Sequence, residues 1–360
     1  MSDVSRTNAP REIEAAPGFT KVAEIAGQGG AVSGIAVSPD GARLMVTHYG
    51  DDSFSLIDTA SCAVAQTVIE IDEPFAIAMS DTSAGRAYVS SAAAAYDSIL
   101  AFDTDANRVV ANYPLAYSVT DLAVSPDGRY VYASRAAVSA ADVAIVDTWT
   151  GDDDAISIAT TAGTTTTECV RVSPDGRRLY VAVNGASTAE LVVIDTRKHR
   201  VLHTVEIGSP IRDIAISPDG ATAYVGSCAP DFGTVLDVLD TRTAAVTNTY
   251  KFGDIAGLLT RLAVSRDGER AYLIGDQSVT VLSTSTQDVL GGIAIDGQPS
   301  CAIESPDGRR LYIADYAGTV TVLTIASATA SVDAHTSEDE PTVANRWAFP
   351  DLLALEPTLA

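Results

Sequence analysis

One tetrapeptide recurs along the chain at nearly constant spacing, and this repeat limits the possible folds more than any other feature. The strict form, Ser-Pro-Asp-Gly, begins at Ser38, Ser125, Ser173, Ser217 and Ser305. Ser265-Arg266-Asp267-Gly268 is a close variant, and a weaker copy begins at Ser80. These seven copies are separated by 42, 45, 48, 44, 48 and 40 residues. Such periods are typical of architectures in which each repeat is one supersecondary unit.

Each repeat has the same internal order of short apolar runs. A run such as Ile35–Val37 precedes the tetrapeptide, whose Pro and Asp-Gly favour a tight turn. A second run follows, for example Arg178–Val183, and a third ends in apolar-Asp-Thr, as at Ile194–Thr196. The fourth run alternates between apolar and polar residues, as in Val201–Ile207. Four strands per repeat and seven repeats predict an all-β fold, a seven-bladed β-propeller of four-stranded blades.

The two ends of the chain predict how the ring closes. Lys21–Ile25 precedes the first inner strand as Val109–Tyr113 precedes the third, so it is expected to be the outer strand of the last blade. The alternative is that Ala328–Val332 fills that place. The sequence thus divides into a flexible segment (1–18), the propeller (19–326) and an acidic, amphipathic C-terminal tail (327–360).

The repeat resembles that of the YVTN family of seven-bladed propellers over about residues 19–326. The resemblance rests on the tetrapeptide, on Val-x-Asp-Thr, and on Tyr followed by a small or apolar residue in the second strand. The Tyr positions are Tyr88, Tyr132, Tyr180, Tyr224, Tyr272 and Tyr312. The resemblance implies the fold but no single activity, because propellers carry unrelated functions. A looser similarity to lactonase-like propellers brings no catalytic residues with it.

Composition excludes some classes of partner and site. The 360 residues carry a net charge of −24, which disfavours binding to nucleic acid. No apolar run approaches the roughly 20 residues of a membrane span, and no secretory signal is evident, so a cytoplasmic protein is expected. Four dispersed cysteines and four histidines lack the spacing of a zinc site, so no metal site or cofactor is evident. The cysteines are interpreted as buried apolar residues, with a reactive thiol as the alternative.

A ligand site is expected at the end of the channel opposite the uniform tetrapeptide turns, where the loops differ between repeats. Those loops and the channel walls supply the candidate ligand-binding residues: His48, Tyr49, Asp51, Arg135, Glu168, Arg171, Arg212, Arg261, Glu304 and Tyr316. His48 beside Asp51 is interpreted as a base or ligand, or else as a solvated loop histidine.

Arg171 and Glu304 replace apolar residues of the other repeats. They either line a hydrated channel and hold a ligand, or pair with neighbouring blades for stability.

The C-terminal tail contains four large apolar residues that follow an acidic stretch. Trp347, Phe349, Leu352 and Leu353 are candidates for partner binding. They form either a docking motif that orders on binding or a segment that packs on the propeller's own rim.

Two functions remain open from the sequence. The first is a non-catalytic platform for a protein partner, with a small ligand at the channel mouth as a further possibility. The second is an enzyme of the lyase, isomerase or lactonase type with its site at the channel mouth. Since no nucleophile motif is present, the enzyme would need a divalent metal.

Overall fold

The chain forms seven four-stranded antiparallel sheets, and their order along the sequence matches the seven repeats. The computed structural model describes residues 14–26, 29–80, 82, 85–93, 96–116, 118–136, 141–158, 165–186, 188–229, 233–253 and 258–326. Each sheet is one blade, and the inner strands of successive blades contact one another in a closed series from β2 to β26 and back to β2. The predicted seven-bladed β-propeller is therefore confirmed.

The first four blades, in order from inner to outer strand, use consecutive segments of the chain. Their strands are β2 (Val32–Val37), β3 (Arg43–His48), β4 (Ser53–Asp58) and β5 (Ala63–Ile69); β6 (Ile77–Met79), β7 (Arg86–Ala92), β8 (Asp97–Asp103) and β9 (Arg108–Leu115); β10 (Ser118–Val124), β11 (Tyr130–Ala136), β12 (Ala141–Asp147) and β13 (Asp153–Ile158); β14 (Thr165–Val172), β15 (Arg178–Gly185), β16 (Ala189–Asp195) and β17 (Arg200–Ile207).

Blades five and six follow the same plan, whereas blade seven takes its outer strand from the other end of the chain. Their strands are β18 (Ile211–Ile216), β19 (Thr222–Ala229), β20 (Gly233–Asp240) and β21 (Ala245–Gly253); β22 (Leu259–Val264), β23 (Arg270–Gly275), β24 (Val279–Ser283) and β25 (Val289–Ile293); β26 (Pro299–Glu304), β27 (Arg310–Asp315), β28 (Thr319–Ile325) and β1 (Phe19–Ala26).

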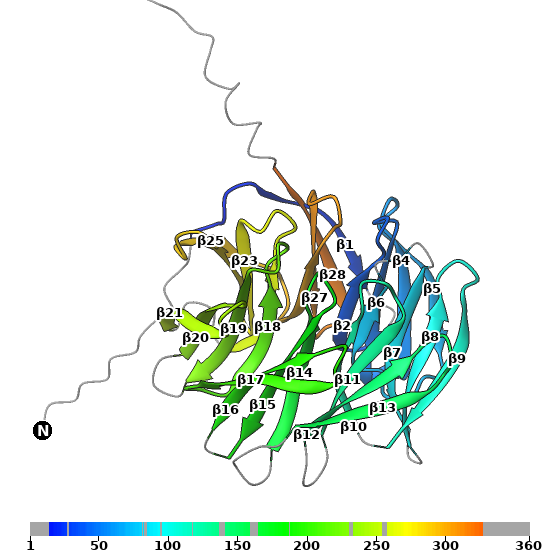
Figure 1. Ribbon diagram of the computed structural model, residues 1–360. Coiled ribbons are helices and arrows are strands. Elements are labelled where there is room, and N and C mark those ends of the chain that lie inside the picture. The colour runs from blue at the N-terminus through cyan, green and yellow to red at the C-terminus, as the bar shows by residue number, and fades with distance from the viewer. Residues whose placement is uncertain are drawn as a thin grey trace, which may run out of the picture. The chain divides into compact units, whose positions relative to one another are not determined.

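The two ends of the propeller are joined by strand β1, which lies beside β28 (Figure 1). Their antiparallel register pairs Phe19 with Ile325 and Ala26 with Thr319. The prediction that the N-terminal strand closes the last blade is confirmed, and β1 occupies the place that the alternative gave to 328–332. Just before β1, the main chain of residues 14–16 bonds to Gly292 of β25, within a stretch predicted to be flexible.

The tetrapeptide turn is held by its own side chains. In blade one, Ser38 Oγ donates to Asp40 Oδ1 at 2.5 Å and accepts from Arg43 N at 2.8 Å. Gly41 has a φ of +71°, which L side chains rarely adopt. The Asp-Thr at the end of each third strand belongs to the same unit, since Thr59 Oγ1 donates to Gly41 O at 2.6 Å. The same Ser–Asp hydrogen bond recurs in five other copies.

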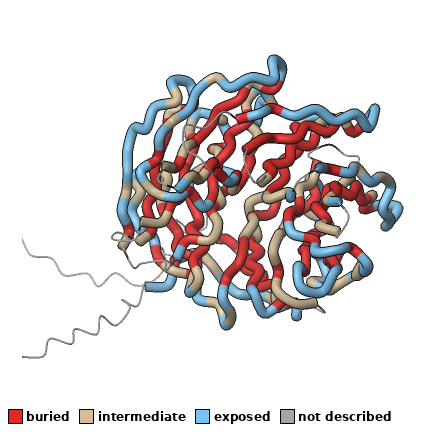
Figure 2. Tube along the Cα trace, turned by 90° about the horizontal axis from the view of Figure 1, so that it is seen from below, coloured by how far each residue is buried: buried red, intermediate tan, exposed pale blue. Residues whose placement is uncertain are grey.

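The hydrophobic core is divided into seven clusters, each lying between two adjacent blades. The repeated Tyr of each second strand packs there; Tyr180, for example, joins Leu191 and Val225 between blades four and five. In blade one, Met45 takes the equivalent place. Figure 2 shows buried segments within the blades and exposed segments mainly at their outer edges. Stability therefore depends on contacts between neighbouring blades.

The loops between second and third strands share one end of the ring with the connections that lead into each inner strand. This end, the channel mouth, lies opposite the tetrapeptide turns. In six blades the pairing of the inner strand shifts just inside the mouth, as between Val119 and Asp121. Such bulges redirect side chains. In the described part of the chain, no helix is long and apolar enough to cross a membrane.

Candidate functional site

A layer of side chains four residues before each repeated Ser lies just inside the channel mouth. Its members are Gly34, Ala76, Asp121, Cys169, Asp213, Arg261 and Cys301. All except Ala76 and Cys169 follow directly on the inner-strand bulge. The repeat thus places three charged groups, from blades three, five and six, in one layer of the channel.

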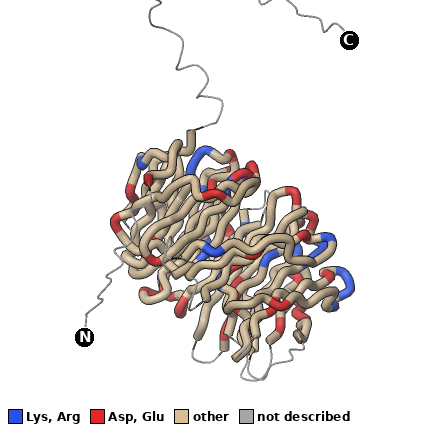
Figure 3. The backbone as a smooth tube through the Cα atoms, turned by 90° about the vertical axis from the view of Figure 1, so that its left-hand side faces the viewer, with Lys and Arg blue, Asp and Glu red and all other residues tan. Residues whose placement is uncertain are grey.

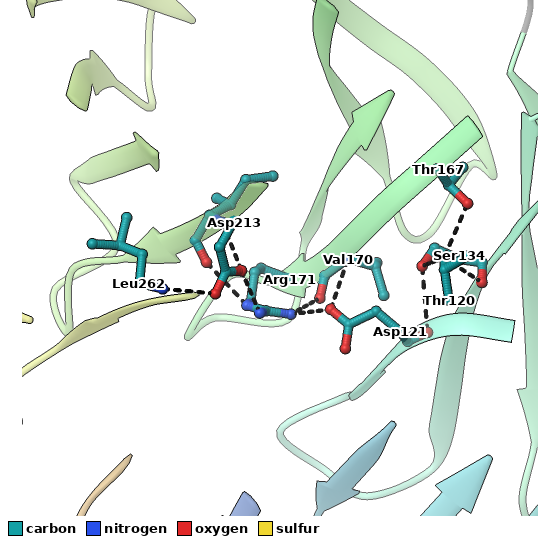
Figure 4. Close-up of polar contacts among 9 residues, drawn as sticks. Thr120, Asp121, Ser134, Thr167, Val170, Arg171, Asp213 and Leu262 are labelled. Atoms are coloured by element: carbon teal, nitrogen blue, oxygen red, sulfur yellow. Dashed lines mark hydrogen bonds and ion pairs between the residues drawn. The ribbon is translucent and has the colours of Figure 1, made fainter. Parts of the chain in front are cut away.

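Arg171 ties blades three, four and five together (Figure 4). Its Nη1 bonds to Asp121 Oδ2, its Nη2 donates to Asp213 Oδ1 at 2.5 Å, and its Nε donates to Ile214 O at 3.0 Å. Both carboxylates also accept main-chain N–H groups of the next blade, from Val170 at 3.2 Å and from Leu262 at 2.9 Å. The interpretation that Arg171 pairs with neighbouring blades agrees with this geometry.

Charge compensation keeps Arg171 ionised inside the channel. Burial disfavours the charged form, but Asp121 and Asp213 outweigh it and raise the pKa of Arg171 above its ordinary value. Its side chain retains an exposed fraction of 27%. Arg171 also lines two cavities inside the channel, of about 360 and 470 Å³. The cluster is therefore an ion-pair network at the edge of a polar channel.

Glu304 accepts a main-chain N–H that the turn of blade six has and the five strict copies lack. Where the five strict copies have Pro, blade six has Arg266, which carries a main-chain N–H. Glu304 Oε2 accepts that N–H at 2.5 Å, and Oε1 accepts from Tyr272 Oη at 2.8 Å. Burial raises the pKa of Glu304, although these two hydrogen bonds oppose the shift. Glu304 thus joins blade seven to blade six near the tetrapeptide turns, away from the mouth.

A cavity of about 390 Å³ opens at the channel mouth. Of the predicted ligand residues, it brings together Tyr49, Glu168 and Arg261. The remaining lining is Glu73, Phe75, Ser90, Ser91, Ala92, Asp97, Ser118, Val119, Thr120 and Thr167. This volume lies within the range of small-molecule sites, about 300–1,000 Å³. We refer to it as the mouth cavity.

The walls of the mouth cavity combine aromatic, hydroxyl and charged groups. The rings of Tyr49 and Phe75 meet edge to face with centroids 6.0 Å apart. Thr120 Oγ1 lies 3.1 Å from Thr167 Oγ1 and so bridges blades three and four (Figure 4). Burial raises the pKa of the Glu168 carboxyl, while Arg212 and Arg261 oppose that shift.

The expectation of a solvated His48 is wrong, because its side chain is fully buried at the end of β3. Nδ1 lies 3.1 Å from Gly30 O and Nε2 lies 3.0 Å from Ser55 Oγ. Asp51 bonds instead to the main-chain N–H of Gly30. The residues between β3 and β4 form one short 3₁₀ turn, Tyr49–Asp51, which leaves Tyr49 on the surface.

The repeat pattern predicts Arg135 in the loop between the second and third strands. The residue lies instead inside strand β11. It is buried and forms a paired hydrogen bond with Asp142, at 2.7 and 2.8 Å. Arg212 lies 3.8 Å from Glu168 Oε1, next to the mouth cavity but outside its lining. Tyr316 is exposed between β27 and β28 and does not line the cavity.

Sequence reasoning missed the two partners of Arg171. Asp121 and Asp213 occupy the same repeat position in the blades that flank Arg171, which is a signal that aligning the repeats could have revealed. It also did not select Asp97 or Glu73, since a loop position alone does not show which loops meet at one cavity.

Trp347, Phe349, Leu352 and Leu353 lie outside the described residues. Within the described ranges, no group of three or more His, Cys, Asp or Glu is placed to hold a metal ion.

Two known proteins resemble the chain over nearly its full length. The seven-bladed beta-propeller protein Rv1057 of Mycobacterium tuberculosis is 46% identical, over 97% of this chain and 95% of that protein. Among solved structures, a chain of the hydrazine synthase of Kuenenia stuttgartiensis matches with a TM-score of 0.71 and 20% identity, over 91% of this chain and 99% of the other. The second likeness shows the fold alone. No model of a protein family matches the chain.

Proposed function

The chain belongs to the family of seven-bladed β-propeller proteins that includes Rv1057, and from this premise we propose that it is a non-catalytic platform that binds a protein partner at its channel mouth. We also propose that its repeat is of the YVTN type, on the Ser-Pro-Asp-Gly turn and the second-strand Tyr. Rv1057 is known by its fold, a seven-bladed beta-propeller. Support for the platform therefore comes from the surface of this chain.

One observation carries the proposal: exposed aromatic side chains gather at the mouth. Of the five exposed aromatic residues in the described part of the chain, Trp149 alone lies at the opposite end. The other four, together with exposed Leu258, form what we call the aromatic arc: Tyr49, Phe75, Tyr96, Leu258 and Tyr316.

The aromatic arc comes from four consecutive blades. Leu258 belongs to blade six, Tyr316 to blade seven, Tyr49 to blade one, and Phe75 and Tyr96 to blade two. Aromatic residues supply much of the binding energy at protein interfaces, and exposed apolar groups in one region indicate such an interface.

Acidic side chains flank the aromatic arc at the same end of the ring. Asp52, Glu73 and Asp296 are exposed in the loops that carry it or lie beside it. Their charge favours a partner whose apolar surface is rimmed by Lys or Arg.

The test compares partner capture by three versions of the full chain: unmodified, Tyr96→Ser/Leu258→Ser/Tyr316→Ser, and Trp149→Ser as the matched control. None of the three substituted arc residues lines the mouth cavity. We expect a protein retained by the unmodified chain and the control but lost with the triple variant, and a purified partner should bind the triple variant at least about tenfold more weakly. Retention of no protein, or equal retention by all three, would reject the platform.

A version that lacks residues 341–360 separates the arc from the tail. We propose that Trp347, Phe349, Leu352 and Leu353 add to the same docking. Loss of capture in this version alone, with the triple variant still active, would assign the partner to the tail instead of the arc.

A further inference from the structure

The mouth cavity is lined by one Arg, Arg261, and by two acidic residues, Glu73 and Asp97, that form no ion pair within 4.0 Å in the described part of the chain. We propose that it binds a small zwitterion of the amino acid type, with the ligand carboxylate on Arg261 and the ligand ammonium group beside Asp97, Glu73 and the Tyr49–Phe75 pair.

Arg261 is available to an anion. In the described part of the chain its guanidinium makes no hydrogen bond and no ion pair within 4.0 Å. Burial disfavours the charged form of Arg261, but the charges of the two acidic residues of its layer, Asp121 and Asp213, outweigh it and raise the pKa of Arg261. Both carboxylates already accept hydrogen bonds from Arg171 and from main-chain N–H groups. Arg261 lines both the mouth cavity and the deeper channel, so its fork of donors is within reach of a ligand at the mouth. A carboxylate is the group that such a fork binds in paired geometry.

Asp97 provides the opposite charge. Its Oδ2 is buried and has no hydrogen-bond partner, and no described cation forms an ion pair with this carboxylate. An uncompensated carboxylate in a partly desolvated wall is costly, and a ligand cation would offset that cost. Tyr49 and Phe75 lie on the same wall, and Glu73 accepts from Tyr49 Oη at 3.2 Å. Aromatic faces beside acids are a favourable setting for an ammonium group.

The two charges come from non-adjacent blades and line one cavity of about 390 Å³. Asp97 begins β8 of blade two and Arg261 lies in β22 of blade six, three blades away in one direction and four in the other. A ligand that contacts both needs a negative and a positive group. The lining contains three acids, Glu73, Asp97 and Glu168, against one Arg, which disfavours a ligand with two negative charges.

This inference goes beyond the proposed platform and does not depend on it. The platform test changes Tyr96, Leu258 and Tyr316, which lie outside the cavity lining, whereas the informative variants of the ligand test, at Arg261 and Asp97, change lining residues. Loss of one activity with retention of the other therefore identifies which proposal fails.

The experiment titrates the full chain by calorimetry with each of the standard amino acids, up to millimolar concentration. For the tightest amino acid, two analogues are then compared: the amine that lacks its carboxylate and the acid that lacks its ammonium group. We expect each analogue to bind at least about tenfold more weakly than the amino acid. Heat from no amino acid, or equal binding of either analogue, would overturn the proposal, and this arm needs no variant.

Variants then assign the two charged ends. Arg261→Met and Asp97→Asn should each weaken the amino acid by at least about tenfold, whereas Arg197→Met, an exposed Arg near the tetrapeptide turns, should leave it unchanged. Arg261→Met should bind the amine analogue as the unmodified chain does, because that ligand has no carboxylate to lose. Full affinity for the amino acid in either cavity variant would overturn the assignment of that end.

Discussion

Arg171 shows why a charged residue in an otherwise apolar repeat position needs its neighbours before it can be interpreted. Its guanidinium donates hydrogen bonds to two carboxylates and two main-chain carbonyls, which belong to three consecutive blades. Without it, Asp121 and Asp213 would face the channel with only main-chain donors. Removing one member of a buried ion pair costs more than the pair contributes, since the remaining charge stays uncompensated.

Arg171→Met should therefore lower the free energy of unfolding by about 3 kcal/mol. Met keeps the length of the side chain and removes its charge and donors. Chemical denaturation measures the change, with Arg197→Met as an exposed control that should change stability by less than about 0.5 kcal/mol. A loss no larger than that of the control would show that the network does not stabilise the ring.

Glu304 leads to a prediction about pH, because burial raises its pKa above the ordinary value of 4.5. The folded chain then holds this proton more tightly than the unfolded chain, so the charged form lowers stability. As pH rises from about 4.5 to above the raised pKa of Glu304, the unmodified chain should lose stability relative to Glu304→Gln. At higher pH the difference in stability should level off. The test measures the unfolding free energy of both chains between about pH 4 and pH 8. Each unit by which folding raises the pKa should change the difference between them by about 1 kcal/mol. A difference that moves in the other direction would contradict the burial argument.

At the scale of elements, the turn between β22 and β23 and the end of β26 form one unit. Elsewhere a turn Pro packs on the Gly of the next blade's turn; a Cβ at Gly176 would lie 3.1 Å from Pro126 Cδ. In blade six Arg266 replaces that Pro, and Glu304 of blade seven accepts its N–H. The two departures from the repeat thus compensate each other.

This compensation predicts non-additive stability changes. Arg266→Pro removes the donor and leaves Glu304 with one partner, whereas Glu304→Val leaves the N–H of Arg266 and the hydroxyl of Tyr272 without their acceptor. Arg266→Pro/Glu304→Val recreates the combination of a turn Pro with an apolar residue in the next blade, which five other junctions carry. We expect the double variant to be more stable than the sum of the single changes by about 1–2 kcal/mol. Additive changes in a double-mutant cycle would show that the two positions are independent.

The strands and turns could be predicted because every copy of the repeat carries the same local chemistry. Ser38, Asp40 and Thr59 hold one turn, and equivalent residues hold the others, so weak signals reinforce one another across the chain. Closure by β1 could be predicted for the same reason, since Lys21–Ile25 stands where other outer strands stand.

The site was less predictable, because it depends on which side chains turn inward and which loops meet. His48 was placed in a loop, as a base or ligand beside Asp51 or as a solvated histidine, but it is still part of β3 and is fully buried. Asp97 and Arg261 are far apart in sequence and share a cavity only because the ring brings blades two and six around one channel. No local pattern contains that information.

At the scale of the whole molecule, the net charge of −24 follows largely from the repeat. Asp40 and its equivalents accept the Ser hydroxyl of the turn, and that hydrogen bond lowers the pKa of Asp40. Asp58 and its equivalents accept main-chain N–H groups after the third strand. Figure 3 shows acidic segments spread over several turns and strand ends. The charge is thus distributed around the ring and does not by itself indicate a cationic partner.

The ring closes without a disulfide among the described cysteines: β1 pairs with β28 within blade seven, and blade seven packs against blade one. Separating these strands would expose two edges and open the cluster that contains Ile25 and Val320. Thr20 and Thr324 are paired across this seam and lie 304 positions apart in sequence. Directly paired residues in antiparallel strands have Cα atoms about 4.5–5.5 Å apart, within the range that a disulfide spans.

A disulfide in Thr20→Cys/Thr324→Cys should therefore stabilise the propeller by about 2–4 kcal/mol, because it removes the entropy of a very long loop from the unfolded chain. Chemical denaturation of the same variant, oxidised and then reduced, measures the gain without changing the sequence. The two single-cysteine variants control for the substitutions and for Cys62 and Cys228, the half-buried native thiols. Equal stability of the oxidised and reduced forms would contradict the expected gain from locking the pairing of Thr20 with Thr324.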